Sequence, residues 1–296
     1  MKKAGYIAIV GRPNVGKSTL LNAVLGEKIA IVSNKPQTTR NRILGILTRG
    51  EAQYIFVDTP GMHKPQNSLG DYMVEAARSS MLDADAVLLI VDAGRPITSV
   101  EENVIAYLKQ SGTPAVLALN KIDLYDAVTV AETIKAYAAQ HTFDAVVPIS
   151  AKKGKQVGDV LAECEKLLPE SDWFFPEDTI TDQPERQMAA EIIREKLLRT
   201  LNKEVPHGIA VVIEEFKEEG KMIRIRAEIF CEKASHKGII GGKNGAELKM
   251  VGTYAREDME KLFGTKGYLN LWVKVKANWR ENEQVVSNFG YNKNEE

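Results

Sequence analysis

Residues 11–18, Gly-Arg-Pro-Asn-Val-Gly-Lys-Ser, constrain the fold of this 296-residue chain more than any other feature. They follow an apolar run at residues 6–10 and precede a segment with helical spacing at residues 18–25. Gly11 and Gly16 let the backbone curl so that amide N–H groups and a helix N-terminus face an anion. We therefore expect a strand, a phosphate-binding loop and a helix, in that order.

The side chains of this loop predict contacts with a nucleotide and a metal. Lys17 would reach the β- and γ-phosphates, and Ser18 would offer its hydroxyl to Mg²⁺. Asn14, Val15 and Thr19 complete the set expected around the phosphates. A phosphate loop alone leaves the choice between ATP and GTP open.

Two later motifs favour guanine as the base. They are Asn120-Lys121-Ile122-Asp123 and Ser150-Ala151-Lys152, each directly after an apolar run. Asp123 could accept from both the N1–H and the exocyclic amine of guanine, a donor pair that adenine lacks. We expect Asn120 to tie this loop to the phosphate loop and the stem of Lys121 to lie over the base. Ser150, Ala151 and Lys152 would close the base pocket.

A third motif, Asp58-Thr59-Pro60-Gly61, follows the apolar run at residues 53–57. Asp58 would lie at the carboxyl edge of the sheet, beside the hydroxyl of Ser18 and the metal. Gly61 could bring its backbone N–H to the γ-phosphate, a contact made with GTP and lost with GDP.

The polar stretch at residues 33–42 predicts a second mobile segment at the phosphates. Thr38 or Thr39 could complete the Mg²⁺ shell, and we favour Thr39. Together, these motifs predict a switch that binds GTP or GDP with Mg²⁺ and hydrolyses GTP.

Hydrolysis would have to proceed without the glutamine side chain that orients the attacking water in many GTPases. Many GTPases place a glutamine directly after the glycine of this third motif to orient the attacking water, but Met62 stands there. We expect Lys17, Asn14 and Thr39 to carry the chemistry. A resemblance to GTPases with asparagine at the position of Asn14 implies that K⁺ could bind beside the phosphates. Asn14 could equally well only shape the loop, and the residues leave both interpretations open.

Alternating apolar and helical segments through residue 168 predict a mainly parallel sheet with helices on both faces. Besides the runs already named, we expect strands at 43–48 and 86–92 and helices near 70–82, 100–111, 128–140 and 157–168. Residues 169–184 have no periodicity and are interpreted as a linker. The chain thus divides into a nucleotide-binding domain at 1–168, the linker and a second domain at 185–296.

The second domain has a different pattern. We expect a helix after Pro184, a hairpin of strands at 208–216 and 222–231, two helices around Gly242-Lys243-Asn244-Gly245, and a strand at 268–276. This order resembles the type II KH domain, an α+β fold that binds single-stranded RNA. Aromatic residues near the C-terminus are expected to pack this domain rather than to stack on RNA: Trp272, Trp279, Phe289 and Tyr291.

The Gly-x-x-Gly turn would let an RNA backbone approach closely, with an apolar groove beside it for unstacked bases. The expected RNA-binding residues are Lys237, Ile239, Ile240, Gly242, Lys243, Asn244, Gly245 and Lys249. Residues 169–296 are slightly acidic overall, but basic residues gather around the turn. We therefore expect a narrow, selective RNA track.

The two cysteines, Cys164 and Cys231, fit no zinc or redox spacing and are interpreted as free thiols of a reducing compartment. No apolar run has the length of a membrane span, so we expect a cytoplasmic protein without a transmembrane segment.

The forms of the five nucleotide motifs, with Gln-Thr-Thr-Arg at residues 37–40, and the KH pattern resemble the Era family of ribosome-assembly GTPases over nearly the whole chain. The resemblance implies binding to the single-stranded 3′ end of 16S rRNA and to the 30S subunit, with a role in 30S assembly and 16S rRNA maturation. We also expect a monomer. Peripheral contact with the inner face of the cell membrane is implied by the resemblance alone, because no strong basic amphipathic helix is visible.

Overall fold

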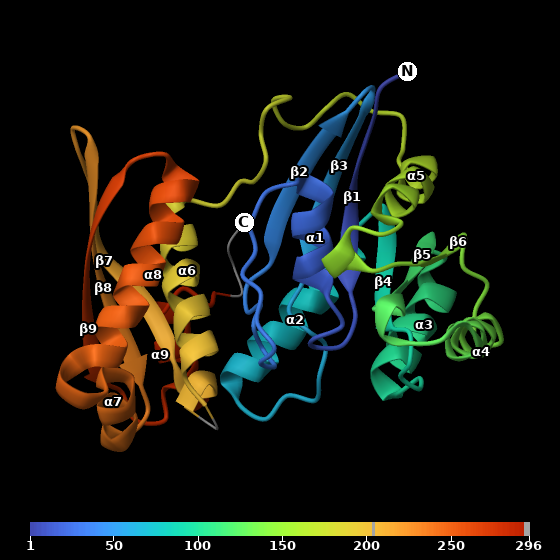
Figure 1. Ribbon diagram of the computed structural model, residues 1–296. Coiled ribbons are helices and arrows are strands. Elements are labelled where there is room, and N and C mark those ends of the chain that lie inside the picture. The colour runs from blue at the N-terminus through green and yellow to red at the C-terminus, as the bar shows by residue number, and fades with distance from the viewer. Residues whose placement is uncertain (203–204, 293–296) are drawn as a thin grey trace. The chain divides into compact units, whose positions relative to one another are not determined.

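Six apolar segments pair into one sheet in the order β2-β3-β1-β4-β5-β6 (Figure 1). In the computed structural model, which describes residues 1–202 and 205–292, all neighbouring strands of this sheet are parallel except β2 and β3. The strands are β1 (Lys3–Val10), β2 (Ile43–Arg49), β3 (Ala52–Asp58), β4 (Ala86–Asp92), β5 (Ala115–Asn120) and β6 (Ala145–Pro148). The predicted, mainly parallel sheet is confirmed.

Helices cover both faces of this sheet because its strands are apolar on both sides. Ile7 and Ile9 of β1 share a core with α1 (Lys17–Leu25) and α5 (Val157–Leu167). Ala8 and Val10 share the opposite core with three other helices. These are α2 (Ser68–Leu82), α3 (Ser99–Ser111) and α4 (Ala127–Ala138). Since β1, β3 and β5 are parallel, the loops that follow them all leave from the same edge of the sheet.

The segment interpreted as a linker lies along the first sheet. The side-chain amide of Gln53 donates to the carbonyl of Phe175 at 2.8 Å and accepts from the backbone N–H groups of Phe174 and Phe175. Farther along, the N–H of Ile46 donates to the carbonyl of Ile180 at 2.7 Å. Residues 174–180 therefore cover part of the sheet edge, which protects its unpaired backbone groups.

A second sheet has the order β7-β8-β9, with β7 and β8 antiparallel and β8 and β9 parallel. Its strands are β7 (Ala210–Glu219), β8 (Met222–Cys231) and β9 (Lys266–Val275). Three helices contribute to the core on one of its faces: α6 (Glu185–Thr200), α7 (Ala234–Gly241) and α8 (Ala246–Phe263). This α+β unit matches the predicted second fold, although β7 extends to Glu219 past a register shift between Ile213 and Glu215.

The C-terminal segment adds the short helices η5 (Trp279–Glu281) and α9 (Glu283–Asn288). Trp279 is buried, donates from its indole N–H to the carbonyl of Gly208 at 2.9 Å, and packs against Phe289 and Tyr291. These three aromatic residues pack the unit as expected. The expectation was wrong for Trp272, whose side chain is exposed because it lies on the outer face of β9.

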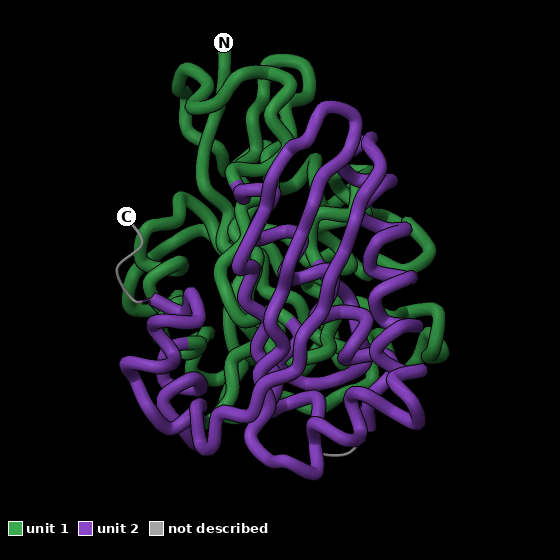
Figure 2. Tube along the Cα trace, turned by 90° about the vertical axis from the view of Figure 1, so that its left-hand side faces the viewer, with its two compact units in different colours: residues 1–30, 39–64, 73–182 green, residues 31–38, 65–72, 183–296 purple. Residues whose placement is uncertain are grey.

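Short 3-10 helices complete the described elements: η1 (Ile122–Leu124), η2 (Ala151–Lys153), η3 (Val205–Gly208) and η4 (Lys243–Gly245). The described contacts divide the chain into two compact units, coloured in Figure 2. The first contains residues 1–30, 39–64 and 73–182, and the second contains residues 31–38, 65–72 and 183–296. Two short segments of the N-terminal part thus belong to the unit that contains α6–α9.

Candidate nucleotide and RNA sites

The loop between β1 and α1 has the backbone that an anion site requires. Gly11 and Gly16 have φ values of +148° and +105°, and Asn14 lies in the left-handed region at +64°. A Cβ atom on Gly16 would lie 2.2 Å from the amide nitrogen of Asn120. Only glycine fits at position 16, because the base-side loop packs directly against the phosphate loop.

Lys17 is buried at the start of α1. Its ammonium donates to the backbone carbonyls of Gly11 and Arg12, both at 3.2 Å. Burial lowers the pKa of Lys17 to about 8, although the carboxylate of Asp58 opposes this shift. A phosphate group at this position would supply the negative charge that favours the charged form.

Three oxygen-bearing side chains meet beside Lys17. The hydroxyl of Ser18 donates to Oδ2 of Asp58 at 2.5 Å and lies 2.8 Å from the hydroxyl of Thr39. Asp58 is fully buried, and burial raises its pKa to about 6 against the effects of Lys17, Ser18 and Thr39. Its Oδ1 atom has no hydrogen-bond partner among the described residues. A hard cation such as Mg²⁺ fits this group, since it prefers oxygen ligands and would satisfy the orphaned carboxylate oxygen.

Thr38 has a different position from Thr39. Its hydroxyl donates to the carbonyl of Lys35 at 2.7 Å and lies 3.0 Å from the hydroxyl of Ser33. Thr38 therefore closes a local turn, while Thr39 lies beside Ser18. This geometry supports Thr39 as the metal-directed threonine.

Asn120 connects three segments. Its amide nitrogen donates to the carbonyl of Val15 at 2.7 Å, and its side-chain oxygen accepts from the N–H groups of Lys121 and Ala151 at 2.8 and 2.9 Å. Val15, Asn120 and Ala151 are all buried. The phosphate loop and both base-side motifs are therefore held together by one side chain.

Asp123 lies next to these groups. Its Oδ1 accepts from the hydroxyl of Ser150 at 2.6 Å, and Lys153 lies 3.6 Å from its Oδ2. The Ser150 hydrogen bond holds the pKa of Asp123 below its usual range, despite some desolvation, so the group is an ionised acceptor at neutral pH. Lys152 is exposed. This is the arrangement expected for a carboxylate that reads two donors on a base.

Gly61 packs against the phosphate loop. A Cβ atom there would lie 2.7 Å from Pro13, and the next backbone N–H, that of Met62, donates to the carbonyl of Gly11 at 3.2 Å. The Met62 side chain is half-buried against the apolar core. Thr19 is half-buried in the first turn of α1.

Two charged contacts at the site were missed from the sequence. Arg12 of the phosphate loop forms an ion pair of 2.5 Å with the fully buried Glu101, which also caps α3 through Thr98. The ammonium of Lys121 lies 2.9 Å from Asp92 at the end of β4. The spacing Thr98-x-x-Glu101 is a readable capping box, but nothing in the sequence pairs it with Arg12.

The Gly-x-x-Gly turn joins α7 to α8 with an unusual backbone. Gly242, Asn244 and Gly245 have positive φ values of 69°, 55° and 79°. Lys243, Asn244 and Gly245 are exposed, and no atom lies within 4 Å of a Cβ placed on Gly245. The turn is therefore open to a polymer backbone at Gly245, whereas a Cβ atom on Gly242 would lie 2.4 Å from the side chain of Glu247. Lys237 and Lys249 on the flanking helices are exposed as well.

The groove beside this turn differs from the expected one. A pocket lies between α8 and β9, lined by Leu248, Lys249, Gly252, Thr253, Arg256, Leu269 and Leu271. The expectation for Ile240 was wrong: its side chain is fully buried in the core, because successive residues of a helix point in different directions. Ile239 is half exposed and lies outside the described lining. Apart from Lys249, the residues of this groove were missed.

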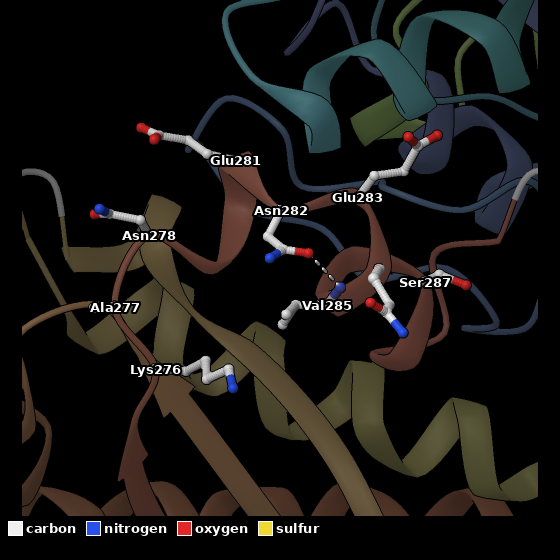
Figure 3. Close-up of a pocket in the computed structure, with 9 residues that line it drawn as sticks. Lys276, Ala277, Asn278, Glu281, Asn282, Glu283, Val285 and Ser287 are labelled. Carbon is white, nitrogen blue, oxygen red and sulfur yellow. Dashed lines mark hydrogen bonds between the residues drawn. The ribbon is translucent and has the colours of Figure 1, made fainter.

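A second pocket lies in the C-terminal segment (Figure 3), where Asn278, Glu281, Asn282, Glu283 and Gln284 mix with Lys276. Asn282 caps α9 by accepting from the N–H of Val285 at 3.2 Å. The acidic and amide lining is unlike the basic lining expected for phosphate binding.

The acidic balance of residues 169–296 arises in the linker segment, since residues 169–184 contain acids but no lysine or arginine. Both cysteines are free and buried. Within residues 1–202 and 205–292, no helix combines the length and apolar character needed to cross a membrane.

A phosphate loop, an oxygen-ligand metal position and an Asn-Lys-x-Asp base site at the carboxyl edge of one sheet define a P-loop GTPase, here followed by a KH fold. A family model described as a 50S ribosome-binding GTPase matches residues 6–121, and a KH domain model matches residues 204–280. GTPase Era of Clostridium kluyveri is 50% identical over 98% of this chain and 100% of its own length.

Two solved structures are similar in fold and in sequence. A crystal structure of Era in complex with MgGDPNP and nucleotides 1506–1542 of 16S ribosomal RNA has a TM-score of 0.95 and 43% identity, covering 98% of this chain and 99% of that chain. A single-substitution variant of Aquifex aeolicus Era bound to GDP·AlF4⁻ has a TM-score of 0.93 and 44% identity, with the same coverage. The chain belongs to the Era family of GTPases.

Proposed function

We propose that this Era-family GTPase hydrolyses Mg²⁺-bound GTP and binds the single-stranded 3′ end of 16S rRNA, acting as a switch in 30S assembly and 16S rRNA maturation. The observation that carries the proposal is the convergence of Asp123, Lys17 and the Ser18–Asp58–Thr39 group at one sheet edge. The similar Era structure contains MgGDPNP and 16S rRNA nucleotides, which supports the same ligands for this chain.

In this proposal the nucleotide residues divide into three roles. Asp123 accepts from guanine, while Asn120, Lys121, Ser150, Ala151 and Lys152 shape the base pocket. Gly11, Asn14, Val15, Gly16, Lys17 and Thr19 surround the phosphates, and Gly61 contacts the γ-phosphate. Ser18, Thr39 and Asp58 hold Mg²⁺, which neutralises charge that develops on the phosphate oxygens.

Catalysis then depends on positioning and charge rather than on a general base. Met62 has no donor or acceptor suited to orienting water. Lys17 already lies buried beside the metal-directed cluster, where charges act more strongly than in water. Asn14 either helps to hold K⁺ at the phosphates or shapes the loop, whose left-handed residue it supplies.

The RNA role rests on the open turn and on the groove between α8 and β9. Lys237, Lys243 and Lys249 would contact phosphates, with Asn244 and the two glycines giving the backbone close access. Leu248, Leu269 and Leu271 offer apolar contacts for unstacked bases. Ile239 stays in the proposal as an exposed apolar contact, and Ile240 supports the turn from the core.

We also propose that residues 1–168 form the GTPase domain, with 169–184 as connector and 185–296 as the KH domain with its C-terminal extension. A cytoplasmic location agrees with two free, buried cysteines, since thiols persist in reducing compartments. Fractionation and liposome co-sedimentation would test the cytoplasmic location and the implied peripheral membrane contact.

Single-turnover hydrolysis of GTP, with and without an oligonucleotide of the 16S rRNA 3′ end, tests this function. We expect Mg²⁺-dependent turnover that the RNA changes several-fold. The double substitution Lys243→Asp with Asn244→Asp should abolish the RNA effect but leave basal turnover intact, because these residues lie in the other unit from the nucleotide loops. If the RNA binds but never alters turnover, the protein is a nucleotide-gated RNA-binding module whose hydrolysis is incidental.

A further inference from the structure

Residues 31–38, the segment just before Thr39, belong to the same compact unit as the KH fold. They are held by polar side chains of α6. The carboxylate of Glu195, fully buried, accepts from the backbone N–H of Val32 at 3.0 Å, and Arg199 donates to the carbonyl of Val32 at 3.2 Å. The segment therefore follows α6 rather than floating as a free loop.

Arg194 makes the contact nearest to the nucleotide motifs. Its side chain is 1% exposed, and its guanidinium donates to the backbone carbonyl of Thr38. Glu191, one turn earlier on α6, accepts from the same guanidinium at 2.7 Å and 2.5 Å. The two-pronged ion pair fixes the plane of the guanidinium, so its donor to Thr38 is held in one direction.

The Thr38 carbonyl belongs to the peptide group that also contains the nitrogen and Cα of Thr39. A peptide group is planar, so a donor that fixes its oxygen also fixes where the next Cα begins. The hydroxyl of Thr39 lies 2.8 Å from that of Ser18, in the cluster that fits Mg²⁺. A ligand to a metal must be placed within about 0.5 Å, so a small rotation of this peptide would remove Thr39 from the shell.

The opposite stripe of α6 is part of the KH core. Ala189, Ile192, Ile193 and Leu197 are buried in the cluster that includes the sheet residues Ile225 and Ile229. A shift of α6 caused by a change in this core would be transmitted through Arg194 to the Thr38 carbonyl, because packed cores resist continuous deformation.

We propose that Arg194 is a positioning residue for the GTPase reaction, which fixes the Thr38–Thr39 peptide so that Thr39 can join the Mg²⁺ shell. Through it, α6 of the KH fold and the γ-phosphate side of the nucleotide site influence each other. The influence is reciprocal, because a coupling free energy acts equally in both directions. The inference rests on the proposed function, in which Thr39 is a ligand of Mg²⁺. It adds that Thr39 binds the metal only in the GTP state, since switch segments are released when the γ-phosphate is lost.

The test compares the affinities of fluorescent mant-GDPNP and mant-GDP in a Mg²⁺ titration. In Arg194→Gln, affinity for mant-GDPNP at saturating Mg²⁺ should fall about tenfold or more, since a charge-assisted hydrogen bond is lost. Affinity for mant-GDP should stay within about twofold, because Thr39 is not needed in the GDP state. Arg194→Lys keeps a positively charged donor, which glutamine does not, and should restore part of the difference.

Arg199→Gln is the matched control, since Arg199 lies on the same helix and contacts the same segment at Val32 rather than at Thr38. Arg199→Gln should keep the parent's ratio of mant-GDPNP affinity to mant-GDP affinity. Glu191→Gln keeps the arginine but weakens its orientation, and an intermediate loss is expected; this variant also serves if Arg194→Gln fails to fold. Far-ultraviolet circular dichroism and thermal melting check the fold of each variant.

A second measurement tests the effect of the bound nucleotide on RNA binding. Affinity for an oligonucleotide of the 16S rRNA 3′ end should differ between the GDP and GDPNP forms of the parent, and this difference should disappear in Arg194→Gln. Folded Arg194 variants with the parent's Mg²⁺-dependent preference for mant-GDPNP would overturn the inference. A parent that binds neither guanine nucleotide would instead overturn the proposed function.

Discussion

Replacing Asp123 by asparagine is the sharpest test of the base site. Ser150 donates to Oδ1 at 2.6 Å, so the asparagine would keep its oxygen at that position and place its amide nitrogen where Oδ2 now lies. The new donor would then face the donors of guanine. Lys153, 3.6 Å from Oδ2, would also lose its ion-pair partner. Xanthine has a carbonyl in place of the exocyclic amine, so it can accept from the new amide.

The magnitude follows from the hydrogen bonds involved. A hydrogen bond to a charged group contributes about 1.5–3 kcal/mol, so the loss of the one at Oδ2 should lower GTP affinity by about one to two powers of ten. The affinity for xanthosine triphosphate should rise by a similar factor. Asp123→Asn with Ser150→Ala should discriminate less, because the amide can then turn either way.

Competition against mant-GDP, measured by fluorescence for both nucleotides, provides the assay. Asp126→Asn is the matched control: Asp126 lies three residues farther along and caps α4 by accepting from the N–H of Thr129, a role that asparagine also fills. Its affinities should equal those of the parent. Unchanged GTP affinity in Asp123→Asn, with no gain for the xanthine nucleotide, would refute the assignment of Asp123.

Three further predictions concern the phosphate side of the site. Lys17→Ala should weaken nucleotide binding and turnover together without unfolding the protein, as calorimetry and single-turnover kinetics would reveal; normal turnover in a folded variant would contradict the role of Lys17. In the proposed function, binding of Mg²⁺-GDPNP needs an ionised Asp58 and a charged Lys17. Burial raises the pKa of Asp58 to about 6 and lowers that of Lys17 to about 8, so the affinity should be highest between these values. Affinity should fall by up to about tenfold per pH unit below and above that window, and a flat profile from pH 5 to 9 would exclude the coupling. If Asn14 helps to hold K⁺, replacing K⁺ by Na⁺ at fixed ionic strength should slow hydrolysis, and Asn14→Ala should remove this ion dependence and lower the rate. The loss of rate should approach about three to five powers of ten only if the ion replaces an arginine finger. Equal rates in K⁺ and Na⁺ would leave Asn14 as a loop-shaping residue, whereas Met62→Ala should barely change the rate in either salt.

The residues of the nucleotide site could be predicted from the sequence because each stands at a local feature of the backbone, such as a tight loop or the end of a strand. Gly16 is needed where Asn120 packs on the loop, and Asp58 stands at the end of an apolar run. Such positions can be recognised in a sequence because the required residue types form short motifs next to apolar runs. The contact between Arg12 and Glu101 forms no such motif, because it joins residues that are 89 positions apart and whose types are common on any surface.

The residues of the RNA groove were harder to predict from the sequence, because the groove depends on which face of each helix or strand is exposed. Ile239 and Ile240 are adjacent and equally apolar, yet one is half exposed and the other is fully buried. Helical periodicity cannot separate them in so short a helix as α7. Trp272 shows the same difficulty in a strand, since alternation predicts two faces but not which of them is covered.

Helix α6 shows why its contacts with residues 31–38, which belong to the same compact unit, could not be predicted from the sequence. Arg194 and Glu195 are almost fully buried, and charged residues in that position require partners because an isolated buried charge is very costly. Their partners include Glu191, Arg199 and the backbone of residues 31–38, which precede them by more than 150 positions. From the sequence, the same charges would be assigned to a solvated helix face. A buried polar stripe opposite an apolar stripe is therefore evidence that a helix has two neighbours, and here the second neighbour is the segment that leads directly into Thr39.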